Sequence, residues 1–181
     1  MSDSLWIMSF AGKYPTLDIL AILFAEYIPY VILLLFVVAI LLQTDMKRRL
    51  YIIFFSTLSL ILSAGIIKAT INHFLYRPRP FVAESITPLI EHAADASFPS
   101  GHATIFFTIA TLIFLCLSRR WGVWAYGVAT LIGLARVYAG LHYPLDIIGG
   151  AAIGVVSPFI IRMLLPEKIT AVMEPEKNMK V

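Results

Sequence analysis

Residues 50–72 read LYIIFFSTLSLILSAGIIKATIN and carry a single charged side chain, Lys68. A helix needs about 20 mostly apolar residues to cross the hydrocarbon core of a bilayer, and this stretch meets that length. Four further stretches meet or approach it, at residues 17–42, 103–117, 121–138 and 145–165. The sequence therefore predicts an all-α, polytopic membrane helix bundle.

The composition agrees with this fold class. Of 181 residues, 60% are hydrophobic, and charged residues make up 14% against about a quarter in soluble domains. A soluble fold of this length buries only about two thirds of its surface, which is too little to hide so many apolar side chains. The single cysteine, Cys116, excludes a disulfide framework and a thiolate zinc site. The net charge of +3 is scattered along the chain, which argues against nucleic acid as a partner.

Residues 1–181 are expected to form one integral membrane domain. Residues 1–16 are amphipathic and predict a short N-terminal interfacial helix. Residues 50–165 form the core that carries the motifs described below. Residues 166–181 are polar and predict a loose cytoplasmic tail.

The number of spans depends on residues 17–42, which Glu26 and Pro29 interrupt. One broken span, which we favour, gives five membrane helices, and a re-entrant pair gives six. With five spans, three connections that share one side hold these basic residues: Lys47, Arg48, Arg49, Arg119, Arg120, Arg162 and Lys168. Basic residues in short loops mark the cytoplasmic side, so the long loop at 74–102 and the connection at 139–146 are expected outside.

Two polar clusters begin on that outer side. In Arg77-Pro78-Arg79-Pro80, each proline biases the residue before it towards extended geometry, which holds two arginines in a stiff segment. In the second cluster, residues 99–102, Ser100 suits a helix N-cap and Gly101 permits close approach of a ligand. The free N–H groups of a helix start bind anions. Taken alone, the clusters could equally serve lipid headgroups and an ordinary helix cap.

The third cluster runs from Arg136 to Asp146. His142 is expected at a helix start, with Asp146 about one turn further along. A carboxylate that accepts a proton from one imidazole nitrogen fixes the tautomer and leaves the other nitrogen free to attack. Together, the three clusters supply cations, N–H donors, a nucleophile and an acid, which is the set that phosphoryl transfer needs. One well-placed carboxylate is too few for magnesium. A zinc site built from histidines is a less favoured alternative, because the arginines would repel a metal and suit phosphate better, so no metal or cofactor is expected.

These clusters resemble the three motifs of the type 2 phosphatidic acid phosphatase (PAP2) superfamily, which also includes vanadium haloperoxidases. The family pattern is Lys, six residues, Arg-Pro; then Pro-Ser-Gly-His; then Ser-Arg, five residues, His, three residues, Asp. The matching positions here are Arg79-Pro80, Pro99-Ser100-Gly101-His102, Arg136, His142 and Asp146.

Two positions depart from the pattern. Asn72 stands where the family has its lysine, and Lys68 lies one helical turn earlier, about 6 Å along the axis. Either side chain could replace the lysine. Ala135 stands where the family has a serine, which removes one hydroxyl contact.

The resemblance implies a phosphatase with a histidine nucleophile. His142 would attack phosphorus, Asp146 would orient His142, and His102 would protonate the leaving oxygen and then activate water. The residues expected to hold the phosphate oxygens are Arg79, Arg136, Ser100, Gly101, Arg77, and Asn72 or Lys68. The scheme requires no metal.

Residues 76–82 and 92–99 look most like bacitracin-resistance-type undecaprenyl-diphosphate phosphatases. This implies a bacterial plasma membrane and an isoprenoid lipid diphosphate as substrate, cleaved on the outer face. Membrane lipids are the other expected partner, and the sequence does not give the oligomeric state. The alternatives are a phosphatidylglycerophosphate or phosphatidic acid phosphatase, a lipid phosphotransferase, and a non-enzymatic lipid-phosphate binder or transporter. The intact histidines and Asp146 argue against the last.

Overall fold

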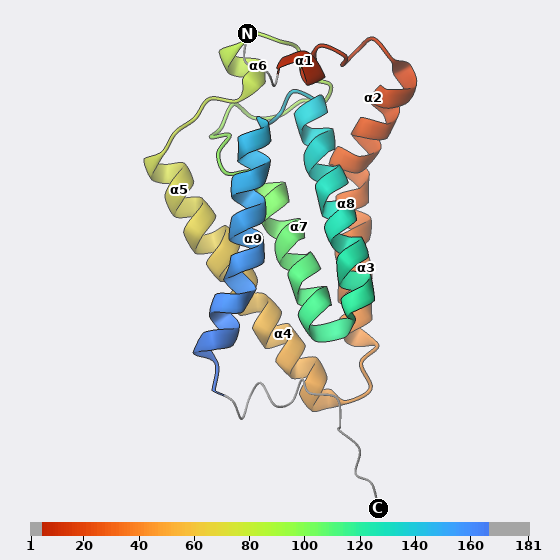
Figure 1. The fold of residues 1–181 in the computed structure, drawn as a ribbon, viewed down its shortest axis with the longest axis vertical. Helices are drawn as coiled ribbons and strands as arrows, with labels where there is room; N and C mark the ends of the chain where they lie inside the picture. The colour runs from red at the N-terminus through yellow and green to blue at the C-terminus, as the bar shows by residue number, and fades with distance from the viewer. Residues whose placement is uncertain (1–4, 167–181) are drawn as a thin grey trace, which may run out of the picture.

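The computed structural model describes residues 5–166, which form five long helical runs (Figure 1). Three of these runs contain a π-helical turn, labelled η. The first two runs are α2 (Pro15–Ile22), η1 (Leu23–Tyr27) and α3 (Ile28–Leu41), then α4 (Met46–Leu60), η2 (Ile61–Lys68) and α5 (Ala69–Phe74). The other three are α7 (Gly101–Leu112) with η3 (Ile113–Leu117), α8 (Arg119–Tyr138), and α9 (Pro144–Leu164). Two single-turn helices, α1 (Leu5–Met8) and α6 (Pro80–Ala83), lie at the end of the bundle that holds the long loop.

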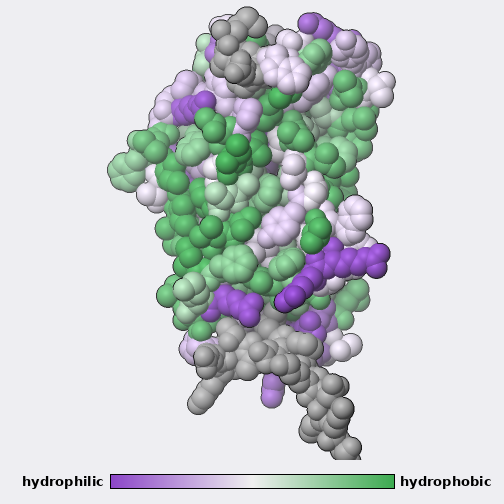
Figure 2. Space-filling model, in the orientation of Figure 1, coloured by the Kyte–Doolittle hydropathy of each residue, from purple (hydrophilic) through white to green (hydrophobic). Residues whose placement is uncertain are grey.

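Three of the five helical runs have the length and composition of membrane spans. The runs at 15–41, 46–74 and 144–164 are each long and apolar enough to cross a bilayer, and the run at 101–117 is a shorter apolar helix. The fifth run, α8, packs along α7. Many large apolar side chains point outwards, and Figure 2 shows hydrophobic residues covering the middle of the bundle, with hydrophilic residues nearer its ends. The chain is a multi-pass membrane protein, and the predicted helix bundle is confirmed.

The first helical run crosses the bundle as one continuous segment despite Glu26 and Pro29. Residues 15–41 are helical throughout, so they form one span rather than a re-entrant pair. The irregularity is the π turn η1, which contains Glu26 and ends shortly before Pro29. Proline has no N–H, so the carbonyl of Ala25, four residues earlier, lacks its α-helical donor.

The predictions for the two ends of the chain concern residues that the structure describes only in part. The expected interfacial helix corresponds to α1, a single turn. Residues 1–4 lie outside the described part. The expected cytoplasmic tail also lies outside it, apart from Pro166.

The contact that organises the bundle joins α7 to α9 through two glycines. A Cβ atom added at Gly150 would lie 2.6 Å from the carbonyl oxygen of Ser100, and one at Gly154 would lie 2.5 Å from that of Thr104. Both separations are too short for a real side chain. Glycines spaced four apart on α9 therefore let its backbone rest directly on α7, as in other close helix pairs in membranes.

We predict that Gly154→Ala lowers the melting temperature in detergent by roughly 2–10 °C, because overpacking costs about 1–3 kcal/mol. The matched control is Gly127→Ala on α8, where an added Cβ meets no atom within 4 Å among the described residues. Equal melting temperatures for the two variants would show that the close α7–α9 contact is absent.

Candidate active site

The site lies at one end of the bundle, where α7 and α9 begin (Figure 1). The backbone N–H of Ser100, the N-cap of α7, donates to the carbonyl of Asp146 in the first turn of α9, at 3.0 Å. The N–H of Leu89 donates to the carbonyl of Ala139 at 3.1 Å, which holds the long loop over the α8–α9 connection. Segments far apart in sequence therefore meet here through backbone hydrogen bonds.

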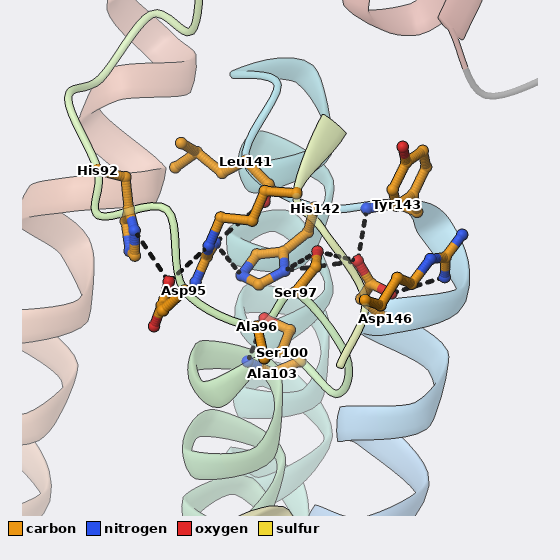
Figure 3. Close-up of polar contacts among 12 residues, drawn as sticks. His92, Asp95, Ala96, Ser97, Ser100, Ala103, Leu141, His142, Tyr143 and Asp146 are labelled. Atoms are coloured by element: carbon orange, nitrogen blue, oxygen red, sulfur yellow. Dashed lines mark hydrogen bonds and ion pairs between the residues drawn. The ribbon is translucent and has the colours of Figure 1, made fainter. Parts of the chain in front are cut away.

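His142 and Asp146 form the centre of the site (Figure 3). Their exposed fractions are 2% and 0%. Nδ1 of His142 lies 3.6 Å from Oδ2 of Asp146, and the hydroxyl of Ser97 lies between the two side chains. Oδ2 also accepts the backbone N–H of Tyr143, at 2.8 Å. The other imidazole nitrogen, Nε2, faces Arg79 at 3.1 Å from Nη1.

Arg77 binds the opposite side of the same carboxylate. Its Nη1 donates to Oδ1 of Asp146 at 2.8 Å, and its guanidinium carbon lies 4.1 Å from the centre of the Tyr143 ring. In this structure, Arg77 therefore neutralises Asp146. A direct contact of Arg77 with phosphate stays a prediction.

Arg79 is 4% exposed and is held from three directions. Nη1 donates to the carbonyl of Leu141 at 3.0 Å and faces His142, and Nε donates to Asp95 at 2.8 Å. Asp95 lies on the long loop, and 56% of its side chain is exposed. Asp95 is not among the site residues that the sequence predicts, and its pairing with Arg79 appears only in the structure.

Arg136 lies on α8 beside His102 of α7, and its exposed fraction is 2%. Its Nη1 lies 3.3 Å from Nε2 of His102 and donates to the carbonyl of Ala25 at the same distance. That carbonyl is the one that Pro29 leaves without a helical donor. Nε and Nη2 of Arg136 are buried and have no hydrogen-bond partner among residues 5–166. Unpaired buried donors are costly, so these two are suited to an anion.

The start of α7 provides the remaining polar groups. Ser100 caps the helix by accepting the N–H of Ala103, as its sequence position predicts. A Cβ added at Gly101 would lie 3.6 Å from Cε and 4.0 Å from Nζ of Lys68, so the Lys68 ammonium reaches this helix start. Asn72 instead donates its amide to the carbonyl of Ala96, at 3.3 Å. Lys68 therefore lies beside the helix start of the predicted anion site, while the amide of Asn72 is bonded to the loop.

The surroundings set the charge of His142. Burial disfavours the imidazolium form and lowers the pKa of His142 from 6.5 to about 4; Asp146 opposes this shift, and the positive charges of Arg79 and Arg136 add to it. His142 is therefore neutral at pH 7. Partial burial raises the pKa of Asp95, but the hydrogen bond and charge of Arg79 outweigh it, so the pKa falls below its ordinary value.

The structure brings together residues from all three predicted clusters. What sequence analysis missed are Ser97, Asp95 and the Ala25 carbonyl. Only the last left a signal, the proline four residues further on. No group of three or more His, Cys, Asp or Glu side chains in the described part of the chain is arranged to hold a metal ion.

Comparisons with known proteins identify the family of the chain. The sequence model described as "PAP2 superfamily" matches residues 49–169, more than half of the chain. The chain is 33% identical to the bacitracin transport permease protein BcrC of Bacillus licheniformis, over 96% of this chain and 90% of that protein. It is 32% identical to undecaprenyl-diphosphatase BcrC of Bacillus subtilis, over 80% of this chain and 72% of that protein.

A solved structure shares the fold. The crystal structure of Aquifex aeolicus LpxE superposes with a TM-score of 0.69 at 28% sequence identity, covering 88% of this chain and 92% of that one. The predicted resemblance, both to the superfamily and to the bacitracin-resistance type, is confirmed.

We predict that NMR titration of His142 gives a midpoint near pH 4. Arg79→Met should raise the midpoint towards 6.5, because it removes a positive charge that opposes protonation. Arg120→Met, at the other end of α8, should leave it unchanged. A wild-type midpoint near 6.5 would contradict the burial and charge described above.

Proposed function

Because the chain belongs to the PAP2 superfamily, we propose that it is a membrane lipid phosphatase that hydrolyses undecaprenyl diphosphate to undecaprenyl phosphate. The observation that carries the proposal is the environment of His142. This imidazole is neutral at pH 7 and buried, Asp146 lies behind Nδ1, and Arg79 faces Nε2. The names of the relatives from the two Bacillus species support the choice of substrate.

The reaction proceeds in two steps. In the first, Nε2 of His142 attacks the terminal phosphorus, a P–N bond forms, and the bond from that phosphorus to the bridging oxygen breaks. His102 gives a proton to the bridging oxygen, and the negative charge of the bound diphosphate favours the protonated form of His102 that this needs. In the second step, His102 takes a proton from water, the hydroxide attacks phosphorus, the P–N bond breaks with its electron pair returning to Nε2, and inorganic phosphate leaves.

Cations and N–H groups hold the terminal phosphate during both steps. Arg79 moves its Nη1 from His142 to a phosphate oxygen, which uncovers the nucleophile. The buried Nε and Nη2 groups of Arg136 donate to the same phosphate. The start of α7 contributes the N–H of Gly101, the hydroxyl proton of Ser100 and the positive end of the helix dipole. Lys68 takes the place of the motif lysine, because its ammonium lies by Gly101.

We propose that the site faces the outside of a bacterial plasma membrane. The support is the distribution of basic residues at the opposite end of the bundle. Arg48 there donates to the carbonyl of Cys116 at 3.1 Å, and Arg49 donates to the carbonyl of Gln43 at 2.7 Å. Basic residues at helix ends mark the cytoplasmic side. The lipid tail of the substrate would stay in the bilayer while its headgroup enters the site.

We predict that protein purified in detergent releases inorganic phosphate from undecaprenyl diphosphate and does so equally well in EDTA. His142→Ala should lower kcat by about 10³-fold or more, because it removes the nucleophile. With substrate labelled in the terminal phosphate, rapid quenching should trap acid-labile label on wild-type protein and none on this variant. The control is His73→Ala, an exposed histidine at the end of α5.

Three results would contradict this proposal. Full activity of His142→Ala would exclude this nucleophile. Faster release from phosphatidylglycerophosphate or phosphatidic acid would reassign the substrate. Tight binding of undecaprenyl diphosphate without phosphate release would identify a binder or transporter.

We predict separately that Lys68→Met lowers kcat/KM by about 10- to 100-fold, mainly through KM, because a charge-assisted contact to phosphate is lost. Asn72→Ala should cost less, since this side chain bonds to the loop carbonyl of Ala96. Lys47→Met, at the other end of the bundle, is the control. A larger loss for Asn72→Ala than for Lys68→Met would assign the phosphate contact to Asn72.

A further inference from the structure

Ser97 touches both members of the central pair. It is fully buried, and its Oγ lies 3.3 Å from Nδ1 of His142 and donates to Oδ2 of Asp146. The direct separation of His142 from Asp146 is 3.6 Å, which is too long for a hydrogen bond. The hydrogen-bonded link from Asp146 to the imidazole therefore runs through the Ser97 hydroxyl, while the carboxylate charge also acts directly across 3.6 Å.

The direction of each hydrogen bond follows from what each group can donate. Asp146 is ionised by its pairing with Arg77, and a carboxylate only accepts. Ser97 has one hydroxyl proton and gives it to Asp146. Its oxygen then offers only lone pairs to His142, so Nδ1 of His142 must carry a proton.

The contact on the other side of the His142 ring, at Nε2, independently indicates the same tautomer. A guanidinium only donates, and Nη1 of Arg79 lies 3.1 Å from Nε2 of His142. Nε2 must therefore present its lone pair. Two contacts on opposite sides of one imidazole thus require the same tautomer, with the proton on Nδ1.

The backbone holds Ser97 where this link needs it. Its N–H donates to the carbonyl of Arg77 at 2.8 Å. The next residue, Phe98, packs on Gly149 of α9, where an added Cβ would lie 2.6 Å from the ring. The loop at Ser97 is thus tied both to the arginine segment and to the helix that carries Asp146.

We infer that Ser97 is a positioning residue, which connects Asp146 to Nδ1 of His142 and keeps the lone pair of Nε2 aimed at phosphorus. The inference rests on the proposed function, in which Nε2 is the nucleophile. When the P–N bond forms, the ring becomes positively charged and keeps its Nδ1 proton. Asp146 then balances that charge, and the Ser97 hydroxyl accepts the Nδ1 proton and links it to the carboxylate.

The test compares three variants in detergent. Ser97→Ala removes the hydroxyl and should lower kcat about 10- to 100-fold, as loss of an orienting partner does elsewhere, with KM within about twofold of wild type. Ser97→Thr keeps the hydroxyl and should recover most of kcat. Ser157→Ala is the matched control, because Ser157 is equally buried but bonds only the carbonyl of Ile153 on its own helix.

A second measurement reports the tautomer without depending on activity. The chain has four histidines, so long-range ¹H–¹⁵N spectra of histidine-labelled protein can be assigned by single substitutions. Wild-type His142 should be protonated on Nδ1 and not on Nε2, and Ser97→Ala should show a mixture of both forms. A merely structural role of Ser97 would alter stability without changing this tautomer.

The outcomes separate this inference from the proposed function. Protonated Nε2 in wild-type protein, or a kcat of Ser97→Ala equal to that of Ser157→Ala in an active enzyme, would overturn the role of Ser97. A wild-type protein that releases no phosphate, yet shows the expected tautomer and loses it in Ser97→Ala, would overturn the proposed function and support the positioning role.

Discussion

The direct backbone contact between α7 and α9 is the constraint on which the site depends. Gly150 and Gly154 remove the side chains that would keep the two helices apart. The first turns of both helices consequently meet, and the Asp146 carbonyl accepts the N–H of Ser100. Helix starts are positive ends, so bringing two of them together builds a region that favours an anion before any arginine is counted.

Buried charge is the second requirement, because the bundle places Arg79, Arg136 and Asp146 at its end with almost no exposure. Buried charges are tolerated when they are paired or hydrogen-bonded. The Asp146 carboxylate is fully compensated, because it accepts hydrogen bonds from Arg77, Ser97 and the backbone. Arg136 is compensated only in part, since two of its N–H groups lack partners within residues 5–166. Because the carboxylate is fully paired and the guanidinium of Arg136 is not, the site favours binding of a negatively charged ligand.

Much of the fold was predictable, because span length and hydropathy require only local sequence. The meeting of Arg79, His142 and Asp146 was predicted through the motif resemblance, and their chemical roles stay predictions. Ser97 and Asp95 could not be found this way, because their roles depend on contacts between segments 16 to 49 residues apart. Which of Lys68 and Asn72 contacts phosphate stays a prediction, although the structure places Lys68 beside Gly101.

The pairing of Arg79 with Asp95 has a consequence for turnover. Asp95 is an internal competitor, since it occupies a guanidinium N–H of Arg79 that a phosphate can also use. Its exposed position on the loop leaves it free to withdraw into water when a more highly charged anion arrives. After hydrolysis, the same carboxylate can return to Arg79 and help to expel inorganic phosphate. Asp95 would thus weaken the binding of substrate to Arg79 and also shorten the time that inorganic phosphate stays bound. The enzyme would lose some substrate affinity and gain a faster turnover.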